Sequence, residues 1–136
     1  MSIEENKELA RRFHSCTLDG YRELMSESFI GHDHLGHSWD RASQIAGLEA
    51  DISAFAGLQD TIHDIVAEGD RVAVRFARSG VFNSSYEDEH SAFEPTYSEV
   101  FFPVMELLRI SDGKIMEGWF YNDDGQTEKT LLGKKA

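Results

Sequence analysis

The spacing between apolar residues changes along the chain, and this change limits which folds the chain can adopt. In residues 3–13 and 41–55, apolar residues recur every three or four positions, which is the spacing of an amphipathic helix. From residue 61 onward the pattern is typical of strands, with Val72, Val74 and Phe76 alternating with other residues. Helices followed by a meander of strands predict an α+β fold, in which N-terminal helices pack on one curved antiparallel sheet.

Polar residues and glycines predict where these elements begin and end. Ser2 and Asp40 are expected to cap the first and the last of three helices, and Asp19 a short helix over residues 19–27. Pro103 lacks a backbone donor and therefore predicts an edge, a bulge or a bend in its strand. We further expect Gly57 to stop the third helix. Strands are expected over residues 61–67, 71–76, 96–110 and 114–123, with turns at 68–70 and 112–113. Loops are expected over residues 29–38 and 83–95, and a compact tail over 125–136.

The length and charge of the chain narrow its class. The chain has 136 residues, of which 40% are apolar. Residues 1–136 are therefore expected to form a single domain with a core and one ligand cavity. A net charge of −12 repels phosphate backbones and anionic lipid, so we expect no nucleic acid and no membrane as partner. Cys16 is the single cysteine, and the acidic residues 1–7 do not resemble a signal peptide. We therefore expect a cytoplasmic protein.

Both faces of the predicted sheet carry apolar side chains. On the long strand, Val100 and Val104 alternate with Phe101 and Met105, which places the two pairs on opposite faces. The helices can cover one face, and a second copy of the chain can cover the other. The sequence therefore predicts a homodimer that associates through the sheet.

Two segments resemble the SnoaL-like polyketide cyclases. Residues 68–75, Glu-Gly-Asp-Arg-Val-Ala-Val-Arg, match the start of a strand in that family. Residues 109–119, with two aspartates soon after them, match its motif Arg-Ile-x-Asp-Gly-Lys-Ile-x-Glu-x-Trp. The family belongs to the nuclear-transport-factor-2-like superfamily, so the resemblance implies a cone-shaped α+β fold with three helices and a curved sheet. That superfamily includes cyclases, isomerases, dehydratases, epoxide hydrolases and non-enzymatic binders.

The resemblance also implies a site for acid/base chemistry without a cofactor. The family's general acid/base is an aspartate shortly after the tryptophan, the place that Asp123 holds four residues after Trp119, with Asp124 one step away. Apolar surroundings would raise the pKa of that carboxyl toward the range needed to remove a proton next to a carbonyl. His32 matches a histidine at the edge of the family's pocket and would assist or orient. The residues leave an alternative open, in which Asp123 and Asp124 only end a strand and cap the next turn.

Aromatic and histidine side chains around these positions are candidates for binding the substrate. Tyr121 can donate a hydrogen bond to a developing enolate oxygen, and Trp39 can stack on a ligand or close the pocket. A place in the core or in the pocket wall is the alternative for each of them. The predicted substrate-binding residues are Trp119, Tyr121, Trp39 and His63.

Charged residues outside this set have structural interpretations. Residues 32–37 contain three histidines and Asp33, but the spacing is not helical and no shell of acidic partners is evident. These histidines are therefore expected to be solvated or locally capped, and no metal is expected. Arg109 lies in an apolar strand and needs a partner, which Glu117 can supply across the hairpin.

The sequence favours a cyclase or isomerase that uses no cofactor and acts on a small apolar or aromatic carbonyl compound. One alternative is a non-catalytic small-molecule-binding or accessory protein of the same fold. Another is a hydrolase or dehydratase that uses a His–Asp pair, for which His32 and Asp123 are the candidates. Relatives often carry Gly-Thr-His where this chain has Gly80-Val81-Phe82, which favours the binding protein, whereas the spacing of Trp119 and Asp123 favours the enzyme.

Overall fold

The computed structural model describes residues 2–87 and 91–133, and it confirms the α+β class. Its helices are α1 (Ile3–Phe13), α2 (Leu18–Leu24), α3 (Arg41–Ala54) and α4 (Asp124–Leu131). Its strands are β1 (Met25–Asp33), β2 (Ser38–Asp40), β3 (Phe55–Glu68), β4 (Arg71–Phe82), β5 (Tyr86–Glu87), β6 (Ala92–Phe93), β7 (Glu99–Ser111) and β8 (Lys114–Tyr121). Among the described residues, no helix has both the length and the apolar character needed to cross a membrane.

Six strands form one curved sheet in the order β2-β1-β8-β7-β4-β3. Most neighbouring strands are antiparallel, but β1 and β8 run parallel, with His32 opposite Trp119. The prediction of a purely antiparallel sheet is therefore wrong for this pair. Parallel neighbours need a long connection, and here α3 and the strands β3, β4 and β7 lie between β1 and β8 in the sequence.

The predicted loop over residues 29–38 is wrong for most of its length, because it contains the end of β1. Gly31 interrupts the apolar pattern, yet it pairs with Trp39 of β2, and a Cβ at Gly31 would overlap the indole ring. The preceding helix α2 consequently ends at Leu24, since the next residues belong to β1. Thr17 caps α2 in place of Asp19, accepting a hydrogen bond from the backbone of Gly20 at 3.1 Å.

Other helix and strand boundaries agree with the predictions only in part. The caps at Ser2 and Asp40 are confirmed, and the predicted tail over residues 125–136 contains most of α4, which begins one residue earlier at Asp124. Strand β3 begins at residue 55, and Gly57 lies inside it with φ +66°. The predicted loop over residues 83–95 contains the pair β5–β6, whose central residues 88–90 lie outside the described part. Pro103 pairs with Ala77 of β4, but the pairing of β7 with β8 ends at Met105, so β7 is an edge on that one side at Pro103.

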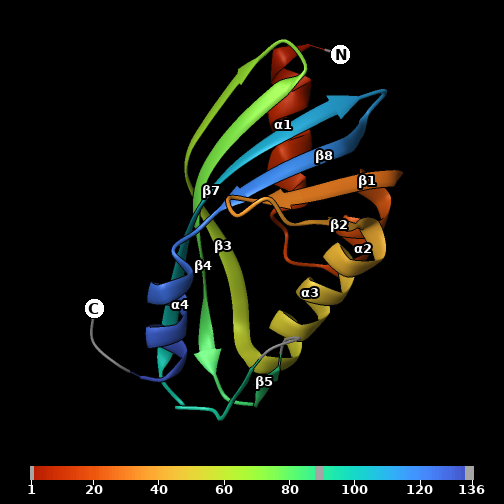
Figure 1. Ribbon diagram of the computed structural model, residues 1–136. Helices are drawn as coiled ribbons and strands as arrows, with labels where there is room; N and C mark the ends of the chain where they lie inside the picture. Colours follow the sequence, from red (N-terminus) through yellow and green to blue (C-terminus); the bar gives the residue numbers. More distant parts are fainter. Residues whose placement is uncertain (1, 88–90, 134–136) are drawn as a thin grey trace.

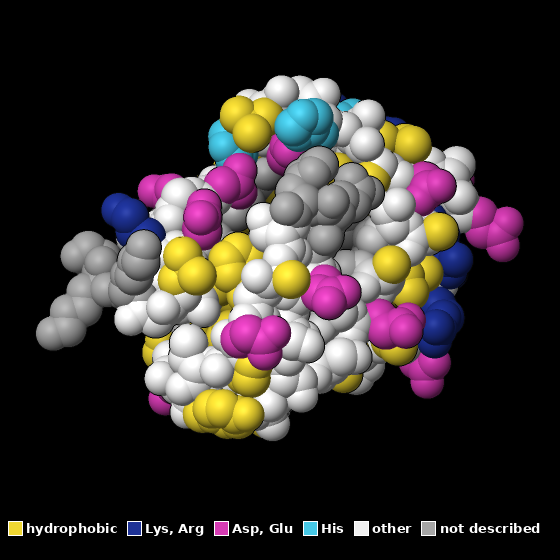
Figure 2. All heavy atoms as spheres, turned by 60° about the horizontal axis from the view of Figure 1, so that its bottom comes forward, with side chains coloured by type: hydrophobic (Ala, Val, Ile, Leu, Met, Phe, Trp, Pro, Cys, Tyr) yellow, Lys and Arg dark blue, Asp and Glu magenta, His cyan; other side chains and the backbone are white. Residues whose placement is uncertain are grey.

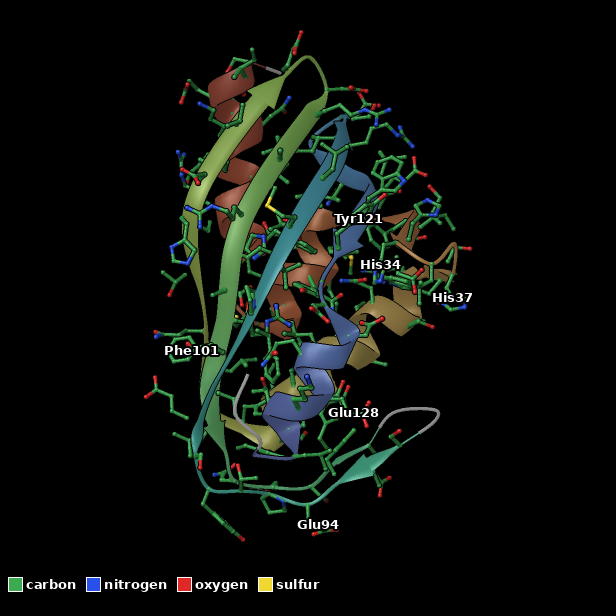
Figure 3. The ribbon with its side chains drawn as sticks, turned by 60° about the vertical axis from the view of Figure 1, so that its left-hand side comes forward. His34, His37, Glu94, Phe101, Tyr121 and Glu128 are labelled. Carbon is green, nitrogen blue, oxygen red and sulfur yellow. The ribbon has the colours of Figure 1, made fainter. Side chains whose placement is uncertain are left out.

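The sheet has an inner face toward the helices and an outer face. Figure 1 shows β3, β4 and β7 curving along their length, with α1 near one end and α3 and α4 near the other. Val72, Val74 and Leu108 point inward and are buried, as the alternation predicts. On the outer face Phe101, labelled in Figure 3, projects to the side opposite α4. Exposed apolar side chains of the sheet are Ile30, Val66, Val81, Phe101, Met105 and Tyr121.

Candidate functional site

A half-open pocket of about 650 Å³ is bounded by the inner face of the sheet, α3, α4 and the β5–β6 pair. We call it the central pocket. Its volume lies within the range of about 300–1,000 Å³ that is usual for small-molecule sites. In Figure 3, His37 and Glu128 mark two sides of its rim. Its apolar wall consists of Phe55, Phe76, Phe93, Phe102, Val104 and Phe120.

Polar side chains that touch one another form the floor of the central pocket. Four of them line the pocket, whereas His14 and Asp60 lie behind these four and are 2% and 0% exposed as side chains. One residue comes from each of six places in the fold: the C-cap of α1, α2, α3, β3, β4 and β7. We call this set the buried ion network; its members are His14, Tyr21, Asp51, Asp60, Arg78 and Glu106.

His14 is held between two carboxylates. Its Nδ1 lies 2.7 Å from Asp60 Oδ2, and its Nε2 lies 2.7 Å from Glu106 Oε2. Burial lowers the pKa of His14, but attraction to Glu106 and hydrogen bonds to Asp60 and Glu106 outweigh it and raise the pKa to about 9. His14 also stands at the C-terminal end of α1, where a positive charge is favoured. The ring is therefore an imidazolium at neutral pH, with both nitrogens donating.

Arg78 joins the remaining members of the network. Its Nε and Nη2 lie 2.8 and 3.0 Å from the two oxygens of Asp60, and its Nη1 lies 2.8 Å from Asp51 Oδ2. Burial would raise the pKa of Asp60, but hydrogen bonds from Arg78 and His14 lower it to about 2. Arg78 Nη2 also donates to Tyr21 Oη at 3.3 Å. Burial raises the pKa of Tyr21 to about 12, against the opposing effect of Arg78, so this hydroxyl keeps its proton.

Strand alternation explains why these charged groups point inward. Glu106 shares a face of β7 with Val104 and Leu108, and Arg78 shares a face of β4 with Phe76. Arg78 lies opposite Asp60 in the β3–β4 register. This network was not predicted from the sequence, although Glu106 stands out as the acidic residue within the apolar residues 100–110. His14 gave no comparable signal, because its partners are distant in sequence.

The structure places His32 and Trp119 on the outer face. His32 Nε2 lies 2.6 Å from Glu117 Oε2, and the ring of His32 stacks on Trp119 with centroids 5.3 Å apart. Arg109 Nε donates to Glu117 Oε1 at 3.1 Å, which confirms the predicted partner of Arg109. The guanidinium of Arg71 lies 5.1 Å from the centroid of Trp119. We call these five residues the outer-face cluster.

Asp123, Tyr121 and His63 come together at a second hollow. It is more open than the central pocket, has a volume of about 530 Å³, and includes the outer-face residues Arg75 and Met105. Asp123 is exposed and caps α4, its Oδ1 accepting a hydrogen bond from the backbone of Gln126 at 3.0 Å. This is the capping arrangement that the sequence left open as an alternative.

Trp39 packs behind the wall of the central pocket and does not line it. Its Nε1 donates to Gln44 Oε1 at 2.6 Å, and its ring stacks on Phe120 with centroids 6.0 Å apart, behind the pocket wall. None of the six predicted site residues lines the central pocket, but Asp124, the neighbour of Asp123, does. Alternation correctly placed Trp119 and Tyr121 on a shared face, and the structure shows that this face is the outer one.

The histidine-rich turn between β1 and β2 reaches the rim of the central pocket. His37 Nδ1 lies 2.8 Å from Asp33 Oδ2, and Asp33 Oδ1 accepts hydrogen bonds from the backbone of Leu35 and His37. The interpretation of a locally capped histidine is therefore confirmed for His37. Across residues 2–87 and 91–133, no group of three or more His, Cys, Asp or Glu side chains is placed to hold a metal ion.

Comparison with known proteins identifies relatives of this arrangement. Residues 6–131 match the sequence model of a family described as SnoaL-like polyketide cyclase. A search of curated proteins finds no match.

Solved structures resemble nearly the whole chain. The candidate hydroxylase AclR from Streptomyces galilaeus superposes with a TM-score of 0.85 at 24% identity, covering 99% of this chain and 85% of AclR. A candidate SnoaL-like polyketide cyclase from Jannaschia sp. CCS1 gives a TM-score of 0.82 at 19% identity, over 99% and 97% of the two chains. IdmH, a candidate polyketide cyclase from Streptomyces antibioticus, gives 0.70 at 25% identity, over 96% and 94%.

Proposed function

This chain belongs to the SnoaL-like polyketide cyclase family, and we propose that it is an acid/base enzyme that works without a cofactor on a small carbonyl compound. The substrate would bind in the central pocket against the apolar wall, with its carbonyl end toward the buried ion network. The observation that carries the proposal is the position of Glu106. Its side chain is 1% exposed, lines the pocket, and is fixed from behind by His14.

Glu106 has the properties of a general base in this arrangement. His14 occupies Oε2, and Oε1 is the oxygen available to accept a proton from the carbon next to the ligand's carbonyl. The C–H electron pair then forms a carbon–carbon double bond while the carbonyl π pair moves to the oxygen, which gives an enolate. Tyr21 keeps its proton beside the pocket and can donate a hydrogen bond to that oxygen. Attack of the enolate on a second carbonyl of the same molecule would be a cyclisation, and reprotonation elsewhere an isomerisation.

Deuterium exchange tests this proposal without knowledge of the natural substrate. The bicyclic ketone β-tetralone fits a pocket of this size, and NMR follows exchange of its acidic C–H groups in deuterated buffer. The wild-type protein is expected to accelerate exchange over buffer, and Glu106→Gln to reduce that acceleration about a hundredfold or more. Glu117→Gln is the matched control, because Glu117 is also a glutamate paired with a histidine but lies on the outer face. Melting curves confirm that each variant is folded.

The same assay tests the role predicted for Asp123. Asp123→Asn preserves a side chain that can cap α4, so it removes the carboxylate with little effect on the helix. Loss of exchange in Asp123→Asn, with normal exchange in Glu106→Gln, would place the chemistry at the second hollow, which Asp123 lines, and would contradict the assignment of Glu106 as the base. If wild-type protein binds β-tetralone without accelerating exchange, the non-catalytic binding protein is the better description.

His32 bonds Glu117 rather than Asp123, but a different His–Asp pair supports the alternative of a hydrolase. Asp33 orients His37 through Nδ1 at the rim of the central pocket, and this leaves Nε2 free to activate a water molecule. Ester or epoxide cleavage that is lost in His37→Gln and retained in Glu106→Gln would favour this alternative.

We also propose that a second copy of the chain covers the outer face. Phe101, Met105 and Tyr121 are 58%, 51% and 54% exposed there. Light scattering after size exclusion is expected to give a dimer for the wild type and a monomer for Met105→Glu. A wild-type monomer at micromolar concentration would contradict this.

A further inference from the structure

The charges around the central pocket point to a ligand of particular chemistry. Among the described residues that line the pocket, five are carboxylates, whereas Arg78 is the single Lys or Arg and His37 the single histidine. In the view of Figure 2, acidic side chains are spread over the visible face, and Lys and Arg side chains stand at its margins. The lining carboxylates are Asp33, Asp51, Glu106, Asp124 and Glu128.

Arg78 is already committed to other partners. Its Nε, Nη1 and Nη2 all donate within the buried ion network, to Asp60, Asp51 and Tyr21. The two carboxylates and the tyrosine leave this guanidinium little capacity to bind an anion in the pocket. A carboxylate or phosphate on the ligand would therefore meet the negative lining without a compensating cation.

Two carboxylates on α4 lack a comparable cationic partner. Asp124 and Glu128 are four residues apart, so they lie on the same side of the helix, and both line the pocket. Asp124 Oδ1 accepts a hydrogen bond from the neutral Asn122 Nδ2 at 3.0 Å, and His34 Nε2 is 3.8 Å from Asp124 Oδ2, a long contact. Within the described part of the chain, no hydrogen bond or ion pair involves the Glu128 side chain. Like charges at this spacing destabilise a helix, and a cation between them would relieve the repulsion.

The apolar wall adds a second attraction for the same kind of group. Phe93, Phe102 and Phe120 line the pocket together with the α4 carboxylates. The faces of aromatic rings attract cations, and they also pack against the body of an apolar ligand. Anionic groups gain neither interaction.

We infer that the central pocket prefers ligands that combine an apolar or aromatic body with a protonated amine, which Asp124 and Glu128 recognise at the rim. The inference rests on the proposed function, since it takes the central pocket to be the substrate site. It adds the class of substrate: an amine-bearing carbonyl compound, with the ammonium group toward α4 and the carbonyl toward Glu106.

Three bicyclic probes of equal size test this preference by calorimetry. They are β-aminotetralin, which is an ammonium ion at neutral pH, the neutral β-tetralol, and tetralin-β-carboxylate. We expect the ammonium to bind about tenfold more tightly than the alcohol, and the carboxylate to bind more weakly than both. The advantage of the ammonium should shrink as salt is raised, because the α4 carboxylates are exposed.

Variants locate the effect. Asp124→Asn combined with Glu128→Gln should remove the advantage of the ammonium and leave the affinity for β-tetralol unchanged. Glu27→Gln is the control, since it removes a carboxylate that is exposed on β1 and does not line the pocket.

The outcomes separate the two proposals. Equal affinity for the ammonium and the alcohol, or an ammonium advantage that survives in the double variant, would overturn the inference and leave the pocket as a neutral-ligand site. If neither the alcohol nor the ammonium binds or competes with β-tetralone, the pocket is not the ligand site, and both proposals are wrong.

Discussion

The buried ion network and the outer-face cluster are built from similar residues but differ in their surroundings. Each contains a histidine hydrogen-bonded to a glutamate, and an arginine that binds a carboxylate. His14 and Glu106 are 2% and 1% exposed as side chains, whereas His32 and Glu117 are 28% and 24% exposed. The first set lies at the floor of a pocket, and the second lies on the open side of the same sheet.

Burial makes the difference between the two sets. In the network, water is excluded, so attraction between the charges is strong enough to raise the pKa of His14 to about 9 against the cost of burial. In the outer-face cluster, hydrogen bonding to His32 and Arg109 lowers the pKa of Glu117, but solvent screens the charges. The network should therefore control stability and chemistry, and the cluster should control neither.

The largest difference is expected when each set loses its arginine. Arg78→Met leaves Asp51 without its cation and Asp60 with His14 as its single cationic partner among the described residues, and the free energy of unfolding should fall by about 3–5 kcal/mol. Arg109→Met leaves Glu117 partly solvated and still bonded to His32, so the loss should stay below about 1 kcal/mol. Urea denaturation measures both. Similar losses in the two variants would contradict the distinction drawn here.

The pH dependence of stability should come from the network. The pKa of His14 rises from 6.5 to about 9 on folding, so its contribution is complete below pH 6.5 and is lost as the pH rises through 9. That contribution amounts to about 3 kcal/mol. His14→Gln should flatten the stability profile between these limits, which urea denaturation at a series of pH values measures.

Asp60 sets the acid side of the same profile. Its pKa is lowered from 3.8 to about 2 on folding, so its contribution is present above pH 3.8 and is lost as the pH falls toward 2. Asp60→Asn should remove this acid-side loss together with part of the stability. The pKa of His14 has an independent check: in an NMR titration, the ring signals of His14 should stay unchanged below pH 8.

A smaller effect is expected at the cap of α4. Asp123→Ala removes the acceptor for the backbone of Gln126 and should lower stability by about 1 kcal/mol. Because Asp123 lies outside the central pocket, exchange of β-tetralone should continue at the wild-type rate. A loss of exchange at unchanged stability would instead assign a chemical role to Asp123.

The smallest effect is expected where Arg71 lies over Trp119. Arg71→Ala removes a cation–π contact on a half-exposed surface, and the stability should change by about 0.5 kcal/mol. Thermal unfolding at low and high salt measures this. A change of several kcal/mol would show that the outer-face cluster is more important than its exposure implies.

Local sequence signals predicted much of the fold. The caps at Ser2 and Asp40, the alternation around Val74, and the pair of Arg109 with Glu117 depend on residues close in sequence or across one hairpin. β1 could not be predicted in this way. Gly31 breaks the local pattern, and its reason for being there, the indole ring of Trp39, is evident only once β2 folds back.

By itself, the sequence determined the class of fold, the family resemblance, and which residues share a strand face. Only the tertiary structure decided which face is inner, because both faces of the sheet carry apolar side chains and alternation alone cannot distinguish them. It also decided where the site lies. His14 and Glu106 are 92 residues apart and meet only when α1 packs across the sheet, at a depth where water cannot screen their charges.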